Sequence, residues 1–222
     1  MKISLRIRIR RFAPVCLLVA ALCGTRGQNA QSPSPANLTA RANFGRKLQI
    51  AGIPNAGQVS AHLYRGAQPE AGTLGKLKAL GVTTIVDLRR EGPDTRAREQ
   101  SEAESLGLHF VSIPLGGFST PTSDQVAQFL KLLAGNSSEI VFVHCHYGDD
   151  RTGVFVATYR IGIEKWPVAR AMDEMNYFGF RAFWHPAMSA FVRGFPSLLV
   201  SVPALQALDI SKPAASGEPP LN

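Results

Sequence analysis

The segment that most restricts how this chain can fold is a short apolar run at residues 140–143, a polar loop, and a second apolar stretch at residues 154–161. Cys145 follows the first run, and Arg151 stands six positions later, just before the second. A brief β-branched run is typical of a buried strand, whereas the longer stretch is typical of a helix. In open α/β sheets, such a loop lies at the carboxyl end of a strand, where ligands bind. We therefore expect an α/β fold with residues 145–151 at its binding edge.

The chemistry of residues 145–151 is suited to a phosphate dianion. Backbone N–H groups that turn inward, together with the positive end of the following helix dipole, make an anion site. The same field favours thiolate over thiol at Cys145. The Arg151 guanidinium is a planar fork that can bind two phosphate oxygens. We therefore expect Cys145 to attack phosphorus and Arg151 to stabilise the transferred phosphoryl group.

The other residues of the loop are assigned supporting parts. Gly148 gives the backbone the freedom to wrap closely around a ligand, and the Thr152 hydroxyl can face the sulfur and steady it as a leaving group. A buried cysteine at a strand end is more often a small hydrophobe, but the strand, loop and helix context favours the reactive interpretation. The predicted phosphate-binding residues are His146, Tyr147, Gly148, Asp149, Asp150 and Arg151.

At this loop the chain resembles the cysteine-dependent dual-specificity and tyrosine phosphatases, whose signature is His-Cys, five residues, Arg, then Ser or Thr. A second block, at residues 63–69 and 80–89, resembles the atypical dual-specificity phosphatases of fungi, plants and bacteria. The likeness runs from about Leu63 to Phe180. It implies a phosphatase that works through a cysteinyl-phosphate intermediate without metal or cofactor. It also implies that His144 tunes the thiolate through the hydrogen bonds of the loop.

The general acid is the point at which the sequence departs from that family pattern. Most members carry an Asp on a loop some thirty residues before the cysteine, but residues 113–121 contain no carboxylate here. Asp150 is the favoured candidate because it adjoins the arginine, and Asp124 is the alternative. Residues 122–125 also resemble a helix capping box, which gives Asp124 a purely structural interpretation. Because a general acid must reach the leaving oxygen, geometry decides between them.

The fold class that the chain predicts is three-layer α/β, with a mostly parallel central sheet of about four to five strands and helices on both faces. The apolar segment at residues 191–208 is interrupted by Arg193, Pro196 and Pro203, so we expect it to pack on the domain. Strands are expected at residues 62–65, 83–88, 109–113 and 140–144, and helices at 70–80, 95–106, 123–134, 152–163 and 168–178.

The amino terminus predicts export. Basic residues precede a short apolar run at residues 12–22, and small and polar residues follow to Gly27, which is the outline of a secretory signal peptide. We expect a signal peptide at residues 1–27, a linker or extension at 28–50, a phosphatase domain at 51–210 and a disordered tail at 211–222. The protein would then be periplasmic or secreted. An N-terminal segment that stays uncleaved as an anchor is the open alternative.

Removing the signal segment changes what the charge and the cysteines imply. The formal net charge of +8 includes six basic residues within residues 1–27 and no acidic ones, which leaves +2. The basic character therefore reflects targeting, and we expect no nucleic-acid partner and no membrane contact of the mature domain. Cys16 and Cys23 would leave with the signal, so only Cys145 would remain in an oxidising compartment, where no internal disulfide could trap it.

The substrate follows less directly from the sequence. Asp149 and Asp150 place negative charge at the predicted mouth, which should repel a polyanion. We therefore expect a phosphorylated protein, with phosphotyrosine preferred, or a small phosphomonoester. Three alternatives remain: an inositol-phosphate phosphatase, a catalytically weak phosphate-binding pseudophosphatase, and an arsenate reductase or sulfur transferase. Loop length and the lack of a second thiol disfavour the last.

The sequence leaves the roles of several other charged or titratable residues open. Arg65 and Arg89 lie near the ends of predicted strands, where each can face the pocket or form a structural salt bridge. His109 and His185 have no motif context. His146 could add positive charge at the mouth when protonated.

Overall fold

A six-stranded mixed sheet forms the centre of the computed structural model, which describes residues 43–134 and 138–208. The strand order is β1-β2-β3-β6-β4-β5. The last four strands in this order are parallel, and β1 and β2 form an antiparallel edge. The predicted α/β class is confirmed, and the sheet is slightly wider than expected. The strands are β1 (Arg46–Lys47), β2 (Gly57–Gln58), β3 (Leu63–Ala67), β4 (Thr84–Arg89), β5 (His109–Leu115) and β6 (Val141–Cys145).

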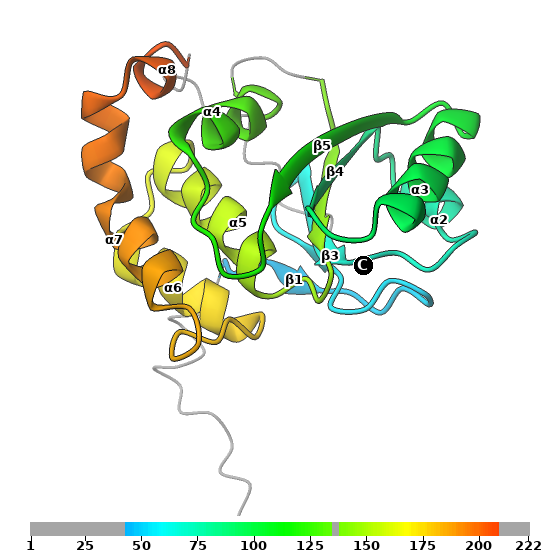
Figure 1. Ribbon diagram of the computed structural model, residues 1–222, viewed down its shortest axis with the longest axis horizontal. Coiled ribbons are helices and arrows are strands. Elements are labelled where there is room, and N and C mark those ends of the chain that lie inside the picture. The colour runs from blue at the N-terminus through cyan, green and yellow to red at the C-terminus, as the bar shows by residue number, and fades with distance from the viewer. Residues whose placement is uncertain (1–42, 135–137, 209–222) are drawn as a thin grey trace, which may run out of the picture.

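Helices cover both faces of the sheet, as predicted (Figure 1). Two helices, α2 (Leu74–Ala79) and α3 (Pro93–Ser105), lie together on one side. The others gather on the opposite side: α4 (Ser123–Lys131), α5 (Asp150–Gly162), α6 (Val168–Tyr177), α7 (Pro186–Ser201) and α8 (Pro203–Gln206).

The central strand β6 separates two hydrophobic cores because its side chains alternate between the faces. Val141 and Val143 join the larger core with α4, α5, α6 and α7, whereas Phe142 joins the smaller core with α2 and α3. Every residue of α5 is buried, because the helix lies between the sheet, α6 and α7. This explains why α5 has no polar face turned to solvent, although it carries charged residues at both ends. Strand β6 and helix α5 therefore form a rigid support for the loop between them.

The ends of the described chain are packed on this core. Residues 43–50 hold β1, and the ring of Phe44 contacts Trp166 and Tyr177, so the folded region starts before residue 51. The segment at residues 191–208 packs against α4 and α5, as expected, although α7 continues through Pro196. Within the described ranges, no helix is long and apolar enough to cross a membrane. The predicted signal peptide and the predicted tail at 211–222 lie outside these ranges.

Candidate active site

The phosphate loop, residues 145–151, runs from the end of β6 into the first turn of α5. Cys145 is 2% exposed, so its sulfur lies at the bottom of the site. Asp149 caps α5 by accepting a hydrogen bond of 2.8 Å from the Asp150 N–H. Gly148 has φ of +72°, and a Cβ there would lie 2.4 Å from the backbone nitrogen of Ala67. Only glycine fits this position, so the predicted need for backbone freedom has a structural cause in β3.

Arg151 is buried, and a carboxylate that the sequence analysis did not single out holds its guanidinium. The two Nη atoms of Arg151 donate to Glu91, with distances of 2.9 Å to Oε2 and 2.6 Å to Oε1. Nη1 also donates to the Leu115 carbonyl at 3.0 Å. Burial opposes the charge of Arg151, but the hydrogen bond to Glu91 and the charges of Cys145 and Glu91 outweigh it and raise the Arg151 pKa. The fork thus faces the sulfur and is held by a two-oxygen partner.

Glu91 lies in the turn between β4 and α3, directly after the carboxyl end of a parallel strand. The hydrogen bond from Arg151 is the main cause that lowers the Glu91 pKa to about 2. The side chain is half exposed. A carboxylate and a phosphate both present two oxygens to a guanidinium, so a phosphate ligand would compete with Glu91 for the same fork. In the sequence, the available signal for Glu91 was its position directly after a strand that ends at the binding edge of the sheet.

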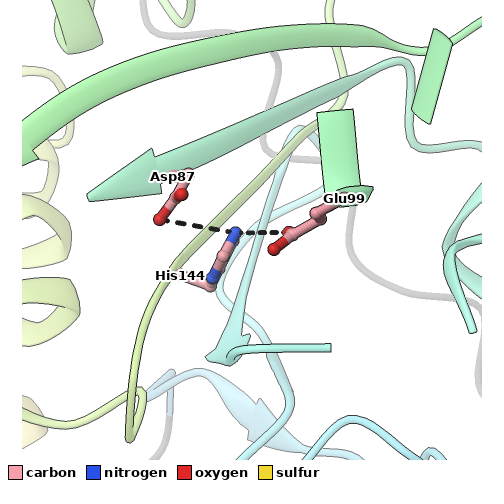
Figure 2. Close-up of side chains that lie close together, drawn as sticks. All are labelled: Asp87, Glu99 and His144. Carbon is pink, nitrogen blue, oxygen red and sulfur yellow. Dashed lines mark ion pairs between the residues drawn. The ribbon is translucent and has the colours of Figure 1, made fainter. Parts of the chain in front are cut away.

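Behind Cys145 lies the buried network, which consists of Asp87, Arg89, Glu99 and His144. Figure 2 shows His144 between Asp87 and Glu99, with its Nε2 atom 2.8 Å from Glu99 Oε1 and 4.0 Å from Asp87 Oδ1. This is an ion-pair distance only, because neither His144 Nε2 nor Glu99 Oε1 has a hydrogen-bond partner in the described chain. Nδ1 of His144 lies 3.4 Å from the Cys145 carbonyl oxygen. The histidine therefore contacts the backbone of the nucleophile, and its tuning role stays a prediction.

Arg89 completes this network by binding both of its carboxylates. Its guanidinium contacts Asp87 Oδ1 at 2.8 Å and Oδ2 at 2.9 Å, and Glu99 Oε2 at 2.6 Å. Of the two interpretations left open for Arg89, the salt bridge is correct. Asp87, Glu99 and His144 are near enough to one another to ligate a metal ion. The guanidinium already binds both carboxylates, however, so this cluster is better described as an ion-pair network.

The two aspartates of the loop contact side chains of the α6–α7 connection. Asp150 accepts from the Arg181 N–H at 3.1 Å and from Arg181 Nη2 at 3.1 Å, and it lies 3.0 Å from His185 Nε2. Asp149 Oδ2 lies 3.4 Å from the same Nη2. The hydrogen bond from Arg181 to Asp150 is the main cause that raises the Arg181 pKa. The expectation that these carboxylates repel a polyanion treated them as unpaired. In the structure, both lie within ion-pair distance of Arg181.

Asp124, the alternative general acid, lies in the first turn of α4 and is exposed. The predicted capping box is present: the Gln125 N–H donates to Thr122 Oγ1 at 3.2 Å, and the Thr122 N–H donates to Gln125 Oε1 at 2.9 Å. Among the residues that the structure describes, no hydrogen bond or ion pair joins Asp124 to the phosphate loop. The structure therefore supports the capping interpretation of this turn.

Thr152 is fully buried, as its supporting role requires. Within residues 43–134 and 138–208, its hydroxyl has no hydrogen-bond partner, so the predicted contact with the sulfur is not formed here. His146 and Tyr147 are exposed, and their rings meet edge to face with centroids 4.4 Å apart. These two side chains therefore lie at the opening of the site.

We define the aromatic rim as four exposed rings from the loop itself and from segments that contact it: Phe118, Tyr147, Phe183 and Trp184. The four side chains are 63% to 85% exposed, which is unusual for large apolar groups. The Phe118 ring stacks on His185 with centroids 4.9 Å apart, and His185 pairs with Asp150 of the loop. Phe183 and Trp184 stand between Arg181 and His185 in the chain and pack edge to face. The rim is thus attached to the phosphate loop by the ion pairs of Asp150.

Comparison with known proteins agrees with this site. Residues 39–190 match the sequence model of a family described as "DSP-PTPase phosphatase fused to NAD+ Kinase". The dual-specificity protein phosphatase TpbA of Pseudomonas aeruginosa is 30% identical over 123 residues, which are 55% of this chain and 54% of TpbA. The chain thus spans about half the length of the curated relatives that it matches.

Solved structures give the same fold. The crystal structure of P. aeruginosa TpbA matches with a TM-score of 0.60 and 25% identity over 72% of this chain and 96% of that chain. A variant of TpbA has been solved in complex with pTyr. The core catalytic domain of a PP-IP phosphatase from S. cerevisiae, solved with citrate, matches with a TM-score of 0.57 and 18% identity, and covers 72% of this chain and 99% of that chain.

Proposed function

This chain belongs to the family of DSP-PTPase phosphatases, and from that premise we propose that it hydrolyses phosphomonoesters through a cysteinyl-phosphate intermediate on Cys145. The observation that carries the proposal is the phosphate loop itself. It presents a buried cysteine at the end of β6, the first turn of α5 and the Arg151 guanidinium to one place. Such an arrangement binds a tetrahedral dianion beside a nucleophile.

The proposed reaction has two displacements. The Cys145 thiolate attacks phosphorus, an S–P bond forms, and the ester P–O bond breaks as the leaving oxygen takes a proton. Water then attacks the phosphocysteine, the S–P bond breaks, and inorganic phosphate and the thiolate are released. Arg151 exchanges the two oxygens of Glu91 for two oxygens of the phosphoryl group, which it follows through both steps.

Replacing Cys145 tests this proposal. A Cys145→Ser variant should lose turnover of an aryl phosphate and keep its affinity for inorganic phosphate, because the loop amides and Arg151 remain. A matched Ser189→Ala variant, which changes a buried hydroxyl in α7 outside the loop, should keep its turnover. Undiminished turnover by Cys145→Ser would remove the nucleophile. A wild type that binds phosphopeptides without releasing phosphate would favour the pseudophosphatase alternative.

We propose phosphotyrosine in a polypeptide as the preferred substrate. The sulfur is deeply buried, so a phosphoryl group on a long, flat side chain reaches it more readily than one on serine. The aromatic rim offers apolar surface to that ring and to residues beside it. The pTyr complex of TpbA supports the same class.

An inositol phosphate is the second candidate, because the pairing of Asp149 and Asp150 with Arg181 offsets one of their two negative charges and weakens the charge argument against a polyanion. The similar fold of a PP-IP phosphatase is compatible with it. Rates on a panel of phosphotyrosine peptides and inositol phosphates distinguish the two. A large preference for the inositol phosphates would overturn the first assignment.

The general acid is proposed to be Asp150, with Asp124 as the alternative, and the structure adds Glu91 as a third carboxylate at Arg151. Arg181 and His185 hold Asp150 at the first turn of α5. The pH–rate profiles of Asp150→Asn, Asp124→Asn and Glu91→Gln assign the donor, because only loss of the acid abolishes the descending limb.

We also propose that the protein is exported, on the basis of the charged and apolar pattern of residues 1–27. The test is the amino-terminal sequence of the protein recovered from the periplasmic or external fraction. A start near residue 25 or 28 supports cleavage. An intact amino terminus in the membrane fraction supports the uncleaved anchor, and recovery in the cytosol contradicts export.

A further inference from the structure

Arg65 is a buried cation of β3 that has no role in the proposed reaction. It lies in the middle of β3, next to β6 in the sheet, with Arg65 paired to Val143 and Ala67 paired to Cys145. Paired residues of parallel strands point to the same face, and so do residues two positions apart. The side chains of Arg65 and Cys145 therefore lie on the same face of the sheet, beneath the phosphate loop.

The guanidinium of Arg65 has an unusual set of contacts. It is fully buried, and Nη2 donates a hydrogen bond of 2.8 Å to the carbonyl oxygen of Gly148 in the phosphate loop. Its Cζ atom lies 4.0 Å from the centroid of the Phe178 ring. Nε and Nη1 have no hydrogen-bond partner in the described chain. The contacts fix the group under the loop but do not neutralise its charge.

Arg65 differs from the other buried arginines because it lacks a carboxylate partner among the described residues. Four arginines are buried in the described part of the chain, and Arg89, Arg151 and Arg160 each pair with a carboxylate. No carboxylate of the described residues lies within 4.0 Å of Arg65. A buried charge without a counter-charge is costly, so it is retained where it has a partner or a task.

The charges around Arg65 identify that partner. Burial lowers the Arg65 pKa to about 10, and the charges of Glu174, Cys145 and Asp149 oppose this in that order, whereas Arg160 adds to it. Glu174 is engaged elsewhere, with Arg160 Nη2 at 2.6 Å and the Gly45 N–H at 2.6 Å. Asp149 caps α5. Cys145, which lies on the same face of the sheet as Arg65, is the remaining group of this set, and a phosphate ligand would bind beside it.

We propose that Arg65 is a positioning residue of the phosphate loop, and that its guanidinium anchors the loop at Gly148 and stabilises the thiolate of Cys145 from beneath. The proposal rests on the proposed function, in which that thiolate is the nucleophile. Arg151 and Arg65 then act on the sulfur from α5 and from β3. The other charged or titratable groups around them are Glu91, His144, His146, Asp149 and Asp150.

The test measures the thiolate directly, without turnover. Full-length protein is alkylated with iodoacetamide over a range of pH, and the modified Cys145 peptide is quantified by mass spectrometry, which separates it from Cys16 and Cys23. Arg65→Gln keeps an amide donor for Gly148 but removes the charge, and Arg65→Lys keeps the charge. At about pH 6 we expect alkylation to be about tenfold slower in the glutamine variant and within about twofold of wild type in the lysine variant.

Lys47→Gln is the matched control, because Lys47 is an exposed cation whose Nζ lies 5.5 Å from the centroid of the same Phe178 ring. It should leave the alkylation rate unchanged. A folded Arg65→Gln variant that reacts like wild type overturns the proposal. If that variant does not fold, the lysine variant decides: a tenfold slower reaction with the charge retained also overturns it. A wild-type Cys145 that shows no thiolate reactivity near neutral pH contradicts the proposed function instead.

Discussion

Two groups of ion pairs flank the phosphate loop, and they differ in whether solvent and ligands can reach them. Behind Cys145 the buried network is closed, because Arg89 binds both carboxylates and Glu99 also contacts His144. At the mouth, Arg151 pairs with the half-exposed Glu91, and the exposed Arg181 pairs with both aspartates of the loop. A closed network cannot lose a member without leaving a buried charge, whereas a mouth pair can exchange its partner for a ligand. We therefore expect the first group to hold the site in place and the Arg151 pair of the second to exchange Glu91 for a phosphate.

Breaking the buried network should have the largest effect. Glu99→Ala leaves Arg89 with one carboxylate and His144 without its 2.8 Å contact. We expect the free energy of unfolding to fall by about 3–5 kcal/mol, as for other buried pairs that lose one partner. Chemical denaturation followed by fluorescence measures it.

Glu104→Ala on the same helix is the matched control, because Glu104 is exposed and its side chain pairs, among the described residues, only with Gln100. It should change the free energy of unfolding by about 0.5 kcal/mol or less. Equal losses from the two variants would contradict the distinction between a closed network and exchangeable surface pairs.

Removing the exchangeable partner at the mouth should strengthen anion binding. Glu91→Ala frees the Arg151 fork and removes a negative charge beside it. We expect inorganic phosphate to inhibit aryl phosphate hydrolysis with a Ki about tenfold lower than in wild type. Competitive inhibition at constant ionic strength measures it. A weaker inhibition would mean that Glu91 orients Arg151 for the ligand and does not compete with it.

The aromatic rim should affect large substrates more than small ones. Trp184→Ala removes an exposed ring from the α6–α7 connection without touching the phosphate loop. We expect the KM for a phosphotyrosine peptide to rise about threefold, with kcat and the kinetics on a small aryl phosphate unchanged. Steady-state kinetics on both substrates measure this. Equal losses on both would place the effect in the loop and not in the rim.

The smallest expected effect is the pH dependence of the Glu91 pair. The hydrogen bond from Arg151 lowers the Glu91 pKa from 4.5 to about 2, so the stabilisation is present above pH 4.5 and is lost as the pH falls towards 2. Because the side chain is half exposed, it amounts to about 0.5 kcal/mol or less. Denaturation of wild type and Glu91→Gln at about pH 7 and about pH 3 measures it, and a gap that widens on acidification would contradict the assignment.

The sequence predicts the elements that support the site because their signals are local. The apolar run of β6 and the apolar stretch of α5 differ in length, so strand and helix are distinguishable. The two-residue strands β1 and β2 are too short to show any period, and they were missed. The start of α2 was placed too early, because residues 70–73 form a turn in which Gly72 has φ of +81°.

The parts of the site that sequence reasoning missed depend on contacts between distant segments. Glu99 lies on a helix that is polar all round, so no pattern marks it as the partner of His144, 45 positions later. Arg181 and His185 reach Asp150 only because α6 and α7 bring their connection to the loop. Arg65 was left between pocket and salt bridge, and the structure shows a third arrangement, a cation buried without a carboxylate. The hydrophobic periodicity of a sequence reports on local structure and contains no information on contacts between distant residues such as these.

The clamp between Asp150 and the α6–α7 connection has a consequence for protein engineering. The same short segment carries two exposed rings, Phe183 and Trp184, and the two side chains, Arg181 and His185, that contact Asp150 in the first turn of α5. A designer who grafts the connection from another enzyme to import its substrate preference would also remove those anchors. Under the proposed function, one stretch of chain would serve both selectivity and catalytic competence, and a transplant would have to carry over Arg181 and His185 or supply equivalents for them.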